Sequence, residues 1–307
     1  MRIGVDLGGT KIEAIAIDAQ SNEIARLRRP TPQGDYEGTL GTIVSLVHEL
    51  ERRFAPTGGP LVPVGIGTPG AFSSAAGRLK NSNSVCLNGQ KLAADLEQRL
   101  GPRLRFANDA NCFALSEAID GAGAGESSVF GVILGTGVGG GIVIHGRVIE
   151  GCNSIAGEWG HNPLARLGDA DAPAPTCYCG RTGCVETWLC GPALVRDHHW
   201  HTGEALTPLA IAAEAVRGNP RCQATIERYC ERAARALAGA INLVDPGVIV
   251  LGGGLSNIDA LYQCIPEYWR KHVFSDTVAT RVVRNRHGDA SGVRGAAWLW
   301  PAGGAVD

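Results

Sequence analysis

The sequence lacks several features that would place it in a specialised class of protein. It has no long run of one charge, and its 28 basic and 30 acidic side chains leave a formal net charge of −2. The basic stripe of a typical nucleic-acid-binding protein is therefore missing. No stretch approaches the roughly 18 apolar residues of a membrane span, and the opening Met-Arg-Ile-Gly-Val-Asp carries no apolar signal-peptide region. We expect a cytoplasmic protein with no membrane and no nucleic acid as partner.

Length and composition indicate a folded α/β protein. With 307 residues, 44% of them hydrophobic and 19% charged, the chain can bury two cores of ordinary size. Its ten cysteines, without a secretion signal, suggest a reducing compartment, where cysteines more often pack or bind metal than form disulfides. The sequence shows no low-complexity linker, so we place a domain boundary within a compact structure, near residue 118.

Glycine is abundant, with 43 residues, and gathers at the ends of predicted strands. A glycine pair separates β runs predicted at Ile3–Asp6 and Ile12–Ile17, which fits a hairpin. A second glycine loop separates β runs predicted at Val129–Leu134 and Ile142–His145. Two copies of strand, glycine loop and strand indicate an internally duplicated architecture.

Hydrophobic spacing predicts further helices and strands, and residues 151–190 are rich in loops. The predicted helices are Tyr36–Phe54, Leu92–Leu100, Asn111–Asp120, Leu206–Gly218, Ala224–Asn242 and Gly292–Trp300, and the strands are Val62–Gly67, Leu104–Ala107 and Val248–Leu251.

The glycine clusters are suited to binding a nucleotide. Without a Cβ, glycine lets the backbone approach a ligand and turn its N–H groups toward a phosphate. The first loop adds a hydroxyl, a lysine and a strand-terminal Asp that can hold hydrated Mg²⁺. It is neither a P-loop nor a Rossmann fingerprint, and the second loop leads into a strand and not into a helix. An ordinary hairpin turn is the alternative for one loop alone. The candidate residues for contact with phosphate or with a flat adenine are Asp6, Gly8, Gly9, Thr10, Lys11, Gly135, Thr136, Gly137, Gly139, Gly252, Gly253 and Gly254.

Asn108-Asp109 ends a predicted strand. A hydroxyl group is a poor nucleophile, so a carboxylate that accepts its proton can assist its attack on a phosphate. On these residues alone, a turn that caps the helix from Asn111 is the ordinary explanation.

Cysteine spacing indicates a metal site. Cys177, Cys179 and Cys184 fall within eight residues, and His161 precedes the first by sixteen. Three thiolates and an imidazole form a closed tetrahedral site, which is structural and not catalytic. The separations differ from a C-x-x-C knuckle, so loosely placed core cysteines are the alternative. The other cysteines are predicted to be core or surface thiols without partners: Cys86, Cys112, Cys152, Cys190, Cys222, Cys230 and Cys264.

Taken together, the three glycine clusters resemble the nucleotide site of the actin and hexokinase superfamily. The segments 157–161 (GEWGH) and 177–186 (CYCGRTGCVE) resemble the two signature segments of the ROK family of sugar kinases and repressors. This match runs from Asp6 nearly to the C-terminus. Within the family, the chain, including its closing segment 288–298, looks most like the bacterial fructokinases (manno(fructo)kinases).

The resemblance implies an α/β fold of the duplicated actin-like ATPase (ribonuclease H-like) type, with two domains that close over both substrates in an interdomain cleft. We expect residues 1–118 and the C-terminal helix 291–307 to form the smaller domain. Residues 119–290 would form the larger domain with a zinc-binding loop. The family also implies a homodimer.

For the site, the resemblance implies Asp109 as general base and structural Zn²⁺ on His161, Cys177, Cys179 and Cys184. The implied sugar-binding residues are Gly70, Asn83, Asn108, Asp109, Glu158, His161 and Glu186. Glu158 and Glu186 flank zinc ligands, so we interpret the metal as fixing two loops whose carboxylates face sugar hydroxyls.

The predicted activity is transfer of phosphate from Mg²⁺-ATP to the 6-hydroxyl of D-fructose, with D-mannose as a second acceptor. Kinases of glucose, N-acetylglucosamine or N-acetylmannosamine share every motif and remain alternatives. A sugar-responsive repressor of the family would carry an added N-terminal helix-turn-helix, whereas Asp6 here already belongs to the first hairpin. An actin-like or chaperone-like ATPase would need neither the His/Cys cluster nor the paired glutamates.

Overall fold

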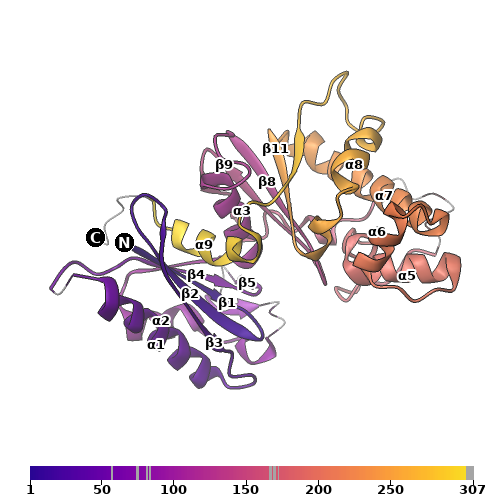
Figure 1. Cartoon of the computed structure of the whole chain (residues 1–307). Helices are drawn as coiled ribbons and strands as arrows, with labels where there is room; N and C mark the ends of the chain where they lie inside the picture. The colour runs from indigo at the N-terminus through magenta and orange to yellow at the C-terminus, as the bar shows by residue number, and fades with distance from the viewer. Residues whose placement is uncertain are drawn as a thin grey trace. The chain divides into compact units, whose positions relative to one another are not determined.

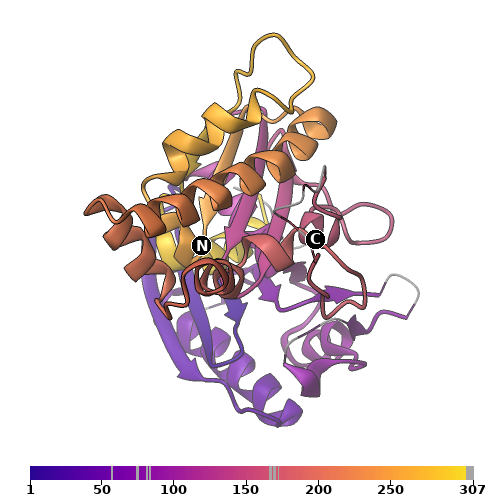
Figure 2. The ribbon, with the colours of Figure 1, turned by 90° about the vertical axis from the view of Figure 1, so that its right-hand side faces the viewer.

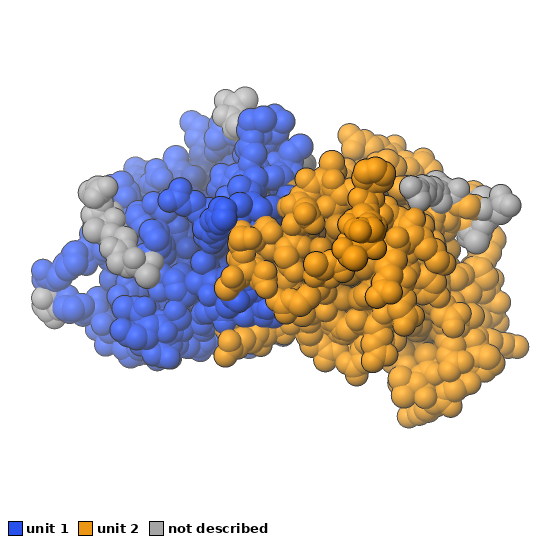
Figure 3. Space-filling model, turned by 90° about the horizontal axis from the view of Figure 1, so that it is seen from above, with its two compact units in different colours: residues 1–124, 141–156, 289–307 blue, residues 125–140, 157–288 orange. Residues whose placement is uncertain are grey.

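The computed structural model describes residues 1–56, 58–73, 76–80, 82, 84–165, 168, 171 and 173–301. The chain forms two compact units, unit 1 from residues 1–124, 141–156 and 289–307, and unit 2 from residues 125–140 and 157–288 (Figure 3). Unit 1 includes residues 141–156, which the sequence-based division assigned to the larger domain. The boundary near residue 118 stays a prediction. No helix among the described residues is long and apolar enough to span a bilayer.

Unit 1 is built on a five-stranded sheet with the strand order β3-β2-β1-β4-β7. Its strands are β1 (Arg2–Leu7), β2 (Lys11–Ile17), β3 (Glu23–Pro30), β4 (Val64–Thr68) and β7 (Leu104–Asn108). The first three strands pair antiparallel, and β4 and β7 then join parallel to β1. The predicted first hairpin is therefore present as β1 and β2.

The second sheet repeats this plan, with the strand order β10-β9-β8-β11-β12. Its strands are β8 (Ser128–Leu134), β9 (Val138–Ile144), β10 (Arg147–Val148), β11 (Val248–Gly252) and β12 (Arg281–Arg284). β11 runs parallel to both β8 and β12. A glycine hairpin followed by parallel strands thus occurs twice, which confirms the predicted duplication.

The remaining elements connect or cover these sheets. They are α1 (Tyr36–Phe54), β5 (Ala71–Phe72), β6 (Leu79–Lys80), η1 (Val85–Leu87), α2 (Leu92–Leu100), α3 (Asp109–Ile119), η2 (Trp159–His161), α4 (Glu186–Leu189), α5 (Gly191–Thr202), α6 (Pro208–Val216), α7 (Pro220–Val244), η4 (Gly254–Asn257), α8 (Leu261–Trp269), η5 (Gly288–Ala290) and α9 (Ser291–Trp298). Figure 1 shows α1 and α2 side by side, and Figure 2 shows α7 and α8 in front of the strands of the second sheet.

Local sequence explains where these helices begin. The Asp35 side chain accepts a hydrogen bond from the Gly38 N–H at the start of α1. Asn219 caps α7 in the same way, and Pro220 occupies its first turn, where a missing N–H costs nothing. The predicted bounds of α1 and α2 match the structure, whereas β3, α5 and α8 had not been predicted.

Strand β2 shows how the first sheet is covered on both faces. Its side chains alternate between faces, as β geometry requires. Ile12, Ala14 and Ala16 belong to the core that α1 and α2 close, whereas Ile15 and Ile17 pack against α9. The short C-terminal helix α9 is therefore as much a part of the core of unit 1 as the N-terminal strands.

Three glycines let α9 lie directly on its neighbours (Figure 1). A Cβ at Gly4 or Gly65 would overlap the backbone carbonyl of Val293 or Ala296 in α9. On α9 itself, a Cβ at Gly295 would overlap the Cys112 carbonyl oxygen of α3. Backbone thus packs on backbone at this point, where no side chain fits.

Replacing Gly295→Ala should lower the free energy of unfolding by about 1–3 kcal/mol or more, because the added methyl group forces α9 away from α3. The matched control is Gly41→Ala on α1, where nothing lies within 4 Å of an added Cβ. That variant should gain about 0.5–1 kcal/mol, because alanine favours a helix over glycine. Urea unfolding of both variants measures the difference, and equal stabilities would contradict this account of the α9 packing.

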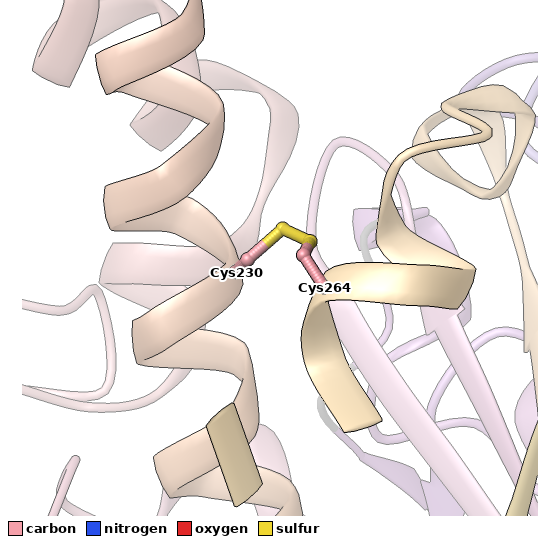
Figure 4. The surroundings of a disulfide bond; sticks show 2 residues. All are labelled: Cys230 and Cys264. Carbon is pink, nitrogen blue, oxygen red and sulfur yellow. A yellow bond between two sulfur atoms is a disulfide. The ribbon is translucent and has the colours of Figure 1, made fainter. Parts of the chain in front are cut away.

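The structure corrects the prediction for two cysteines. Cys230 of α7 and Cys264 of α8, predicted to be unpaired thiols, form a disulfide (Figure 4). The two helices pack side by side and bring the Cα atoms to 6.0 Å, a separation that a disulfide spans. The residues are 34 positions apart, and no sequence pattern pairs them.

Candidate functional site

The carboxyl ends of three parallel strands gather candidate residues at one edge of the first sheet. Asp6 on β1 is in register with Gly67 on β4, and Thr68 on β4 is in register with Asn108 on β7. Carboxyl ends of neighbouring parallel strands share one edge of a sheet, where α/β proteins bind ligands. Asp6 and the Asn108-Asp109 pair, far apart in the sequence, are therefore neighbours.

Electrostatics couples the two carboxylates of this edge. Burial, together with the negative charges of Asp109 and Glu13, raises the pKa of Asp6 to about 7 against the opposing effect of Lys11. The Asp109 side chain is accessible to solvent, yet the protein around it desolvates its charge enough to raise its pKa above the usual range. A divalent cation would relieve the repulsion between these carboxylates.

The Asn108-Asp109 pair is, in part, the helix cap that the residues alone suggested. The Asn108 side chain accepts a hydrogen bond from the Asn111 N–H at 2.7 Å, so Asn108 caps α3. Asp109 occupies the first turn, and its Oδ1 accepts a hydrogen bond from the Ala110 N–H at 2.8 Å. The cap and the hydrogen bond from the Ala110 N–H together fix the direction of the Asp109 carboxylate at the start of α3.

The first glycine hairpin presents an exposed tip. The Gly8 N–H donates to the Lys11 carbonyl at 3.0 Å, and Gly9 and Thr10 between them are exposed. Thr31 braces the loop, because its N–H donates to Thr10 and its hydroxyl to Gly8. The Lys11 Nζ atom lies 3.4 Å from a Glu13 carboxylate oxygen.

The second hairpin and the third glycine loop lie together in unit 2. The turn is closed by the Gly135 N–H, which donates to Gly137 at 3.0 Å. Gly252 at the end of β11 is in register with Ile133 of β8, so the third loop begins beside this turn. Gly253 has a φ of +79°, and a Cβ there would meet the Leu134 backbone.

A pocket of about 590 Å³ opens directly after the third glycine loop. Its walls come from η4, α6, α7 and α8, and they are mainly apolar. Asn257 and Ile258 line it on one side, and Ala212 and Val216 of α6 line it on the other. A flat apolar group such as a nucleobase matches this lining.

The segment 157–161 packs on the second hairpin. The Trp159 indole N–H donates to the Gly139 carbonyl at 3.0 Å, and its ring meets Phe130 edge-on with centroids 5.7 Å apart. A Cβ at Gly140 would come within 2.7 Å of the Trp159 ring, so glycine is required for this contact. The hairpin thus supports the loop that carries Glu158 and His161.

Glu186, at the first position of α4, contacts the same hairpin. Its Oε2 accepts a hydrogen bond from the Val138 N–H at 2.9 Å. A Cβ at Gly137 would lie 2.7 Å from that oxygen. The other carboxylate oxygen, Oε1, is 4.0 Å from the Cys177 sulfur. Glu186 therefore connects the hairpin with the cysteine cluster.

The four predicted metal ligands converge. One ligand atom from each of His161, Cys177, Cys179 and Cys184 lies within 4.8 Å of all the others. Cys177 Sγ is 3.6 Å from His161 Nδ1, and Cys179 Sγ is 3.6 Å from Cys184 Sγ. Ligands placed on a tetrahedron at the Zn–S distance of about 2.3 Å lie roughly 3.7 Å apart. The residues present therefore fit a tetrahedral S₃N zinc site.

Backbone pairing also joins the two loops of this cluster. Val185 N–H donates to the Asn162 carbonyl at 2.8 Å, and Leu164 N–H donates to the Gly183 carbonyl at 2.9 Å. Pro163 and Cys184 form an antiparallel bridge. The loops are thus paired through their own backbones as well as through any metal.

A buried ion-pair network anchors the connection between His161 and Cys177. Asp171 accepts hydrogen bonds from Arg232 and Arg235 of α7, each at 2.8 Å. The Arg232 guanidinium also lies 4.7 Å from the centroid of the Trp188 ring of α4, two positions after Glu186. All three charged side chains are nearly inaccessible to solvent, so the pairing satisfies charges that would be costly alone.

Within each of the two units, the structure brings most of the predicted site residues of that unit close together. Glu158 precedes η2, and Gly70, with a φ of +84°, follows β4. Asn83 lies outside the described residues. Sequence reasoning missed the supporting contacts of Trp159 and Asp171, and also that of the Tyr178 hydroxyl, which lies 3.0 Å from His161 Nε2. Only the position of Trp159 and Tyr178 inside the two signature segments was a signal.

Comparison with known proteins decides the family. The model of the ROK family matches residues 2–302. The chain belongs to the ROK family. A curated relative from Pectobacterium atrosepticum, named N-acetyl-D-glucosamine kinase, is 40% identical over 304 residues, covering 97% of this chain and 98% of the relative.

Solved structures of the family share the fold of this ROK protein. The ROK hexokinase of Thermus thermophilus aligns with a TM-score of 0.83 and 30% identity, over 97% of this chain and 96% of that one. A ROK glucokinase from Streptomyces griseus, solved with glucose and AMPPNP, aligns with a TM-score of 0.75 and 28% identity, over 97% and 98% of the chains. The predicted duplicated actin-like ATPase fold is confirmed.

Proposed function

We propose that this ROK protein is an ATP-dependent sugar kinase that phosphorylates the 6-hydroxyl of N-acetyl-D-glucosamine. The observation that carries the proposal is Asp109, a solvent-accessible carboxylate with a raised pKa at the carboxyl edge of a parallel sheet. A carboxylate whose pKa is raised accepts a proton more readily than an ordinary surface carboxylate. The 40% identity to a curated N-acetyl-D-glucosamine kinase supports the substrate class.

In the proposed reaction, Asp109 accepts the proton of the sugar 6-hydroxyl as its oxygen attacks the γ-phosphorus of ATP. The bond between that phosphorus and the β,γ-bridging oxygen breaks, and ADP leaves with its charge on that oxygen. The raised pKa makes the Asp109 carboxylate a stronger base, and the hydrogen bond that it accepts from the Ala110 N–H fixes its orientation. Mg²⁺ would neutralise phosphate charge, and Asp6 is the residue suited to hold its hydration shell.

The nucleotide is assigned to the glycine loops. Exposed backbone at Gly9 and Thr10 suits phosphate oxygens, and the turn at 135–137 offers a second such loop. The apolar pocket after Gly254 suits the adenine base. The proposal thus keeps the twelve candidate residues of the three glycine clusters as the nucleotide contacts.

The comparisons do not support the sequence-based preference for fructose as the acceptor sugar. The whole chain looks most like the bacterial fructokinases, and this resemblance makes fructose the acceptor that the sequence alone predicts. The curated relative matched over nearly its whole length is instead named for N-acetyl-D-glucosamine, which was among the alternatives. We therefore place N-acetyl-D-glucosamine before D-fructose and D-mannose.

A coupled ADP-release assay with Mg²⁺-ATP should show sugar-dependent turnover. We expect the highest kcat/KM with N-acetyl-D-glucosamine, in a panel with fructose, mannose, glucose and N-acetylmannosamine. A 6-deoxy form of the preferred sugar should bind without releasing ADP, because it lacks the accepting hydroxyl. Absence of turnover with every sugar would refute the kinase proposal, whereas a preference for fructose would refute only the substrate.

Zinc is the metal that the cluster suits, and its proposed role is structural. Three sulfur ligands and one imidazole fill all four tetrahedral positions and leave none for a substrate. His161, Cys177, Cys179 and Cys184 would hold the ion, whose two positive charges would offset two of the three thiolate charges. The two loops beside it carry Glu158 and Glu186, whose carboxylates we assign to sugar hydroxyls.

The purified protein should carry about one zinc per chain by elemental analysis. Cys184→Ser should lose the metal and raise the KM for sugar more than the KM for ATP, because the loop of Glu186 loses one of its anchors. Cys152→Ser is the matched control, since Cys152 is an exposed cysteine outside the cluster. A folded, zinc-free protein with an unchanged KM for sugar would contradict the structural role.

A further inference from the structure

We propose that the disulfide between Cys230 and Cys264 is a reversible thiol switch on the nucleotide pocket. In the oxidised form it holds two walls of the pocket together, and its reduction by a dithiol weakens ATP binding. The proposal rests on the assignment of that pocket to adenine under the proposed kinase function. It adds redox control of ATP binding, located wholly within unit 2.

The disulfide joins two of the helices that line the pocket. Cys230 lies on α7 and Cys264 on α8, and Figure 4 shows the bond crossing from one helix to the other. Cys264 is itself a lining residue of the pocket of about 590 Å³. Ile226, another lining residue, lies one helical turn before Cys230 on the same side of α7. The bond therefore ties the α7 wall of the pocket to the α8 wall.

The α8 wall is also connected to the third glycine loop. The Tyr262 hydroxyl, in the first turn of α8, donates a hydrogen bond to the Ser256 carbonyl of η4 at 2.6 Å. The Ser256 hydroxyl in turn donates to the Gly253 carbonyl at 2.7 Å. Two hydrogen bonds thus link α8 to the loop that is assigned to the nucleotide. A shift of α8 relative to α7 would change the pocket and this loop together.

The two cysteines differ in how a reductant can reach them. Cys230 is completely buried, whereas Cys264 is half-buried and lines the pocket. A thiolate of a dithiol that enters the pocket attacks the Cys264 sulfur, the S–S bond breaks, and Cys230 leaves as a thiolate that takes up a proton. The second thiol of the reductant then displaces Cys264. Two electrons and two protons pass to the protein, which gains two thiols, and the dithiol becomes a disulfide.

Nucleotide binding and reduction are coupled in this arrangement. A nucleobase in the pocket covers Cys264 and shields it from the reductant. By linkage, a ligand that binds the oxidised form more tightly than the reduced form also makes the oxidised form harder to reduce. The redox state of the cysteine pair and the affinity for nucleotide therefore report on the same equilibrium.

The other cysteines favour a reversible role for this disulfide over a permanent one. All eight of them are free thiols. The proposed zinc site needs Cys177, Cys179 and Cys184 as thiolates, so the protein would work where reductants are present. Disulfides under such conditions are usually transient, catalytic or redox-sensing.

The test compares nucleotide binding by the two redox forms of the full, zinc-loaded chain. Calorimetry with AMPPNP and Mg²⁺ should give a dissociation constant about 5-fold or more higher after reduction by dithiothreitol, as is usual for coupled sites. The KM for ATP should rise in parallel, whereas the KM for sugar should stay unchanged. Saturating AMPPNP should slow the reduction, followed as loss of the disulfide-linked peptide by mass spectrometry.

The matched control is the double variant Cys230→Ser and Cys264→Ser, which cannot form the bond. It should bind AMPPNP as weakly as the reduced wild type, and dithiothreitol should not change its affinity further. This second result separates the switch from any effect of the reagent on the zinc cluster. Should the variant fail to fold, the wild type before and after reduction still decides, with its zinc content measured in both forms.

Equal nucleotide affinity of the two redox forms would overturn the proposal, as would absence of the linked peptide from protein treated with oxidised glutathione. Reduction at the same rate with and without AMPPNP would overturn it too, because the disulfide would then lie outside the nucleotide site. If AMPPNP binding responds to reduction while no sugar supports ADP release, the kinase proposal fails and the switch stands.

Discussion

Three sulfur atoms and one imidazole nitrogen meet within 4.8 Å, and most of the proposed sugar site depends on that convergence. Burial raises the pKa of the Cys184 thiol to about 12, with the neighbouring cysteines adding to the effect. Such a sulfur stays protonated until a cation replaces its proton, so metal binding and loop geometry are linked. The positions of the residues that flank the ligands in sequence depend on this cluster as well. These residues are Glu158, Tyr178 and Glu186.

The glycines determine how closely the residues around this cluster approach the glycine hairpin of unit 2. Gly137 leaves room for the Glu186 carboxylate, and Gly140 leaves room for the Trp159 ring. Gly160 in turn lies against the Val138 carbonyl, where any Cβ would overlap it. The hairpin and the loops that carry Glu158 and Glu186 therefore form one packed set of residues. Glycines likewise let the backbone of α9 pack directly on its neighbours in unit 1.

The elements that could be predicted from the sequence are those with a local, periodic pattern of apolar residues. The bounds of α1 and α2 follow from apolar spacing, and both glycine hairpins follow from strand patterns around a turn. Strand β3 was missed because it is an edge strand of exposed, charged residues, two of which pair with Glu13. Helix α8 was missed because Pro266 interrupts its pattern.

The supports of the site could not be predicted, because they join residues far apart in the chain. Glu186 meets the backbone of Val138, 48 positions away, and Asp171 meets Arg232, 61 positions away. The disulfide between Cys230 and Cys264 is of the same kind. The metal ligands could be named only because their spacing is short and a family resemblance supported it. The choice of sugar depends on pocket shape, which one sequence does not contain.

The central claim is that Asp109 acts as the base, and the most direct test separates binding from turnover in Asp109→Asn. Asparagine keeps the size of the side chain and can still accept the hydrogen bond from the Ala110 N–H, so folding should be preserved. We predict that kcat falls by about 10²–10⁴-fold, the usual contribution of general base catalysis, while the sugar dissociation constant measured by calorimetry changes less than threefold. Turnover near the wild-type rate, or a loss explained entirely by weaker sugar binding, would contradict the account.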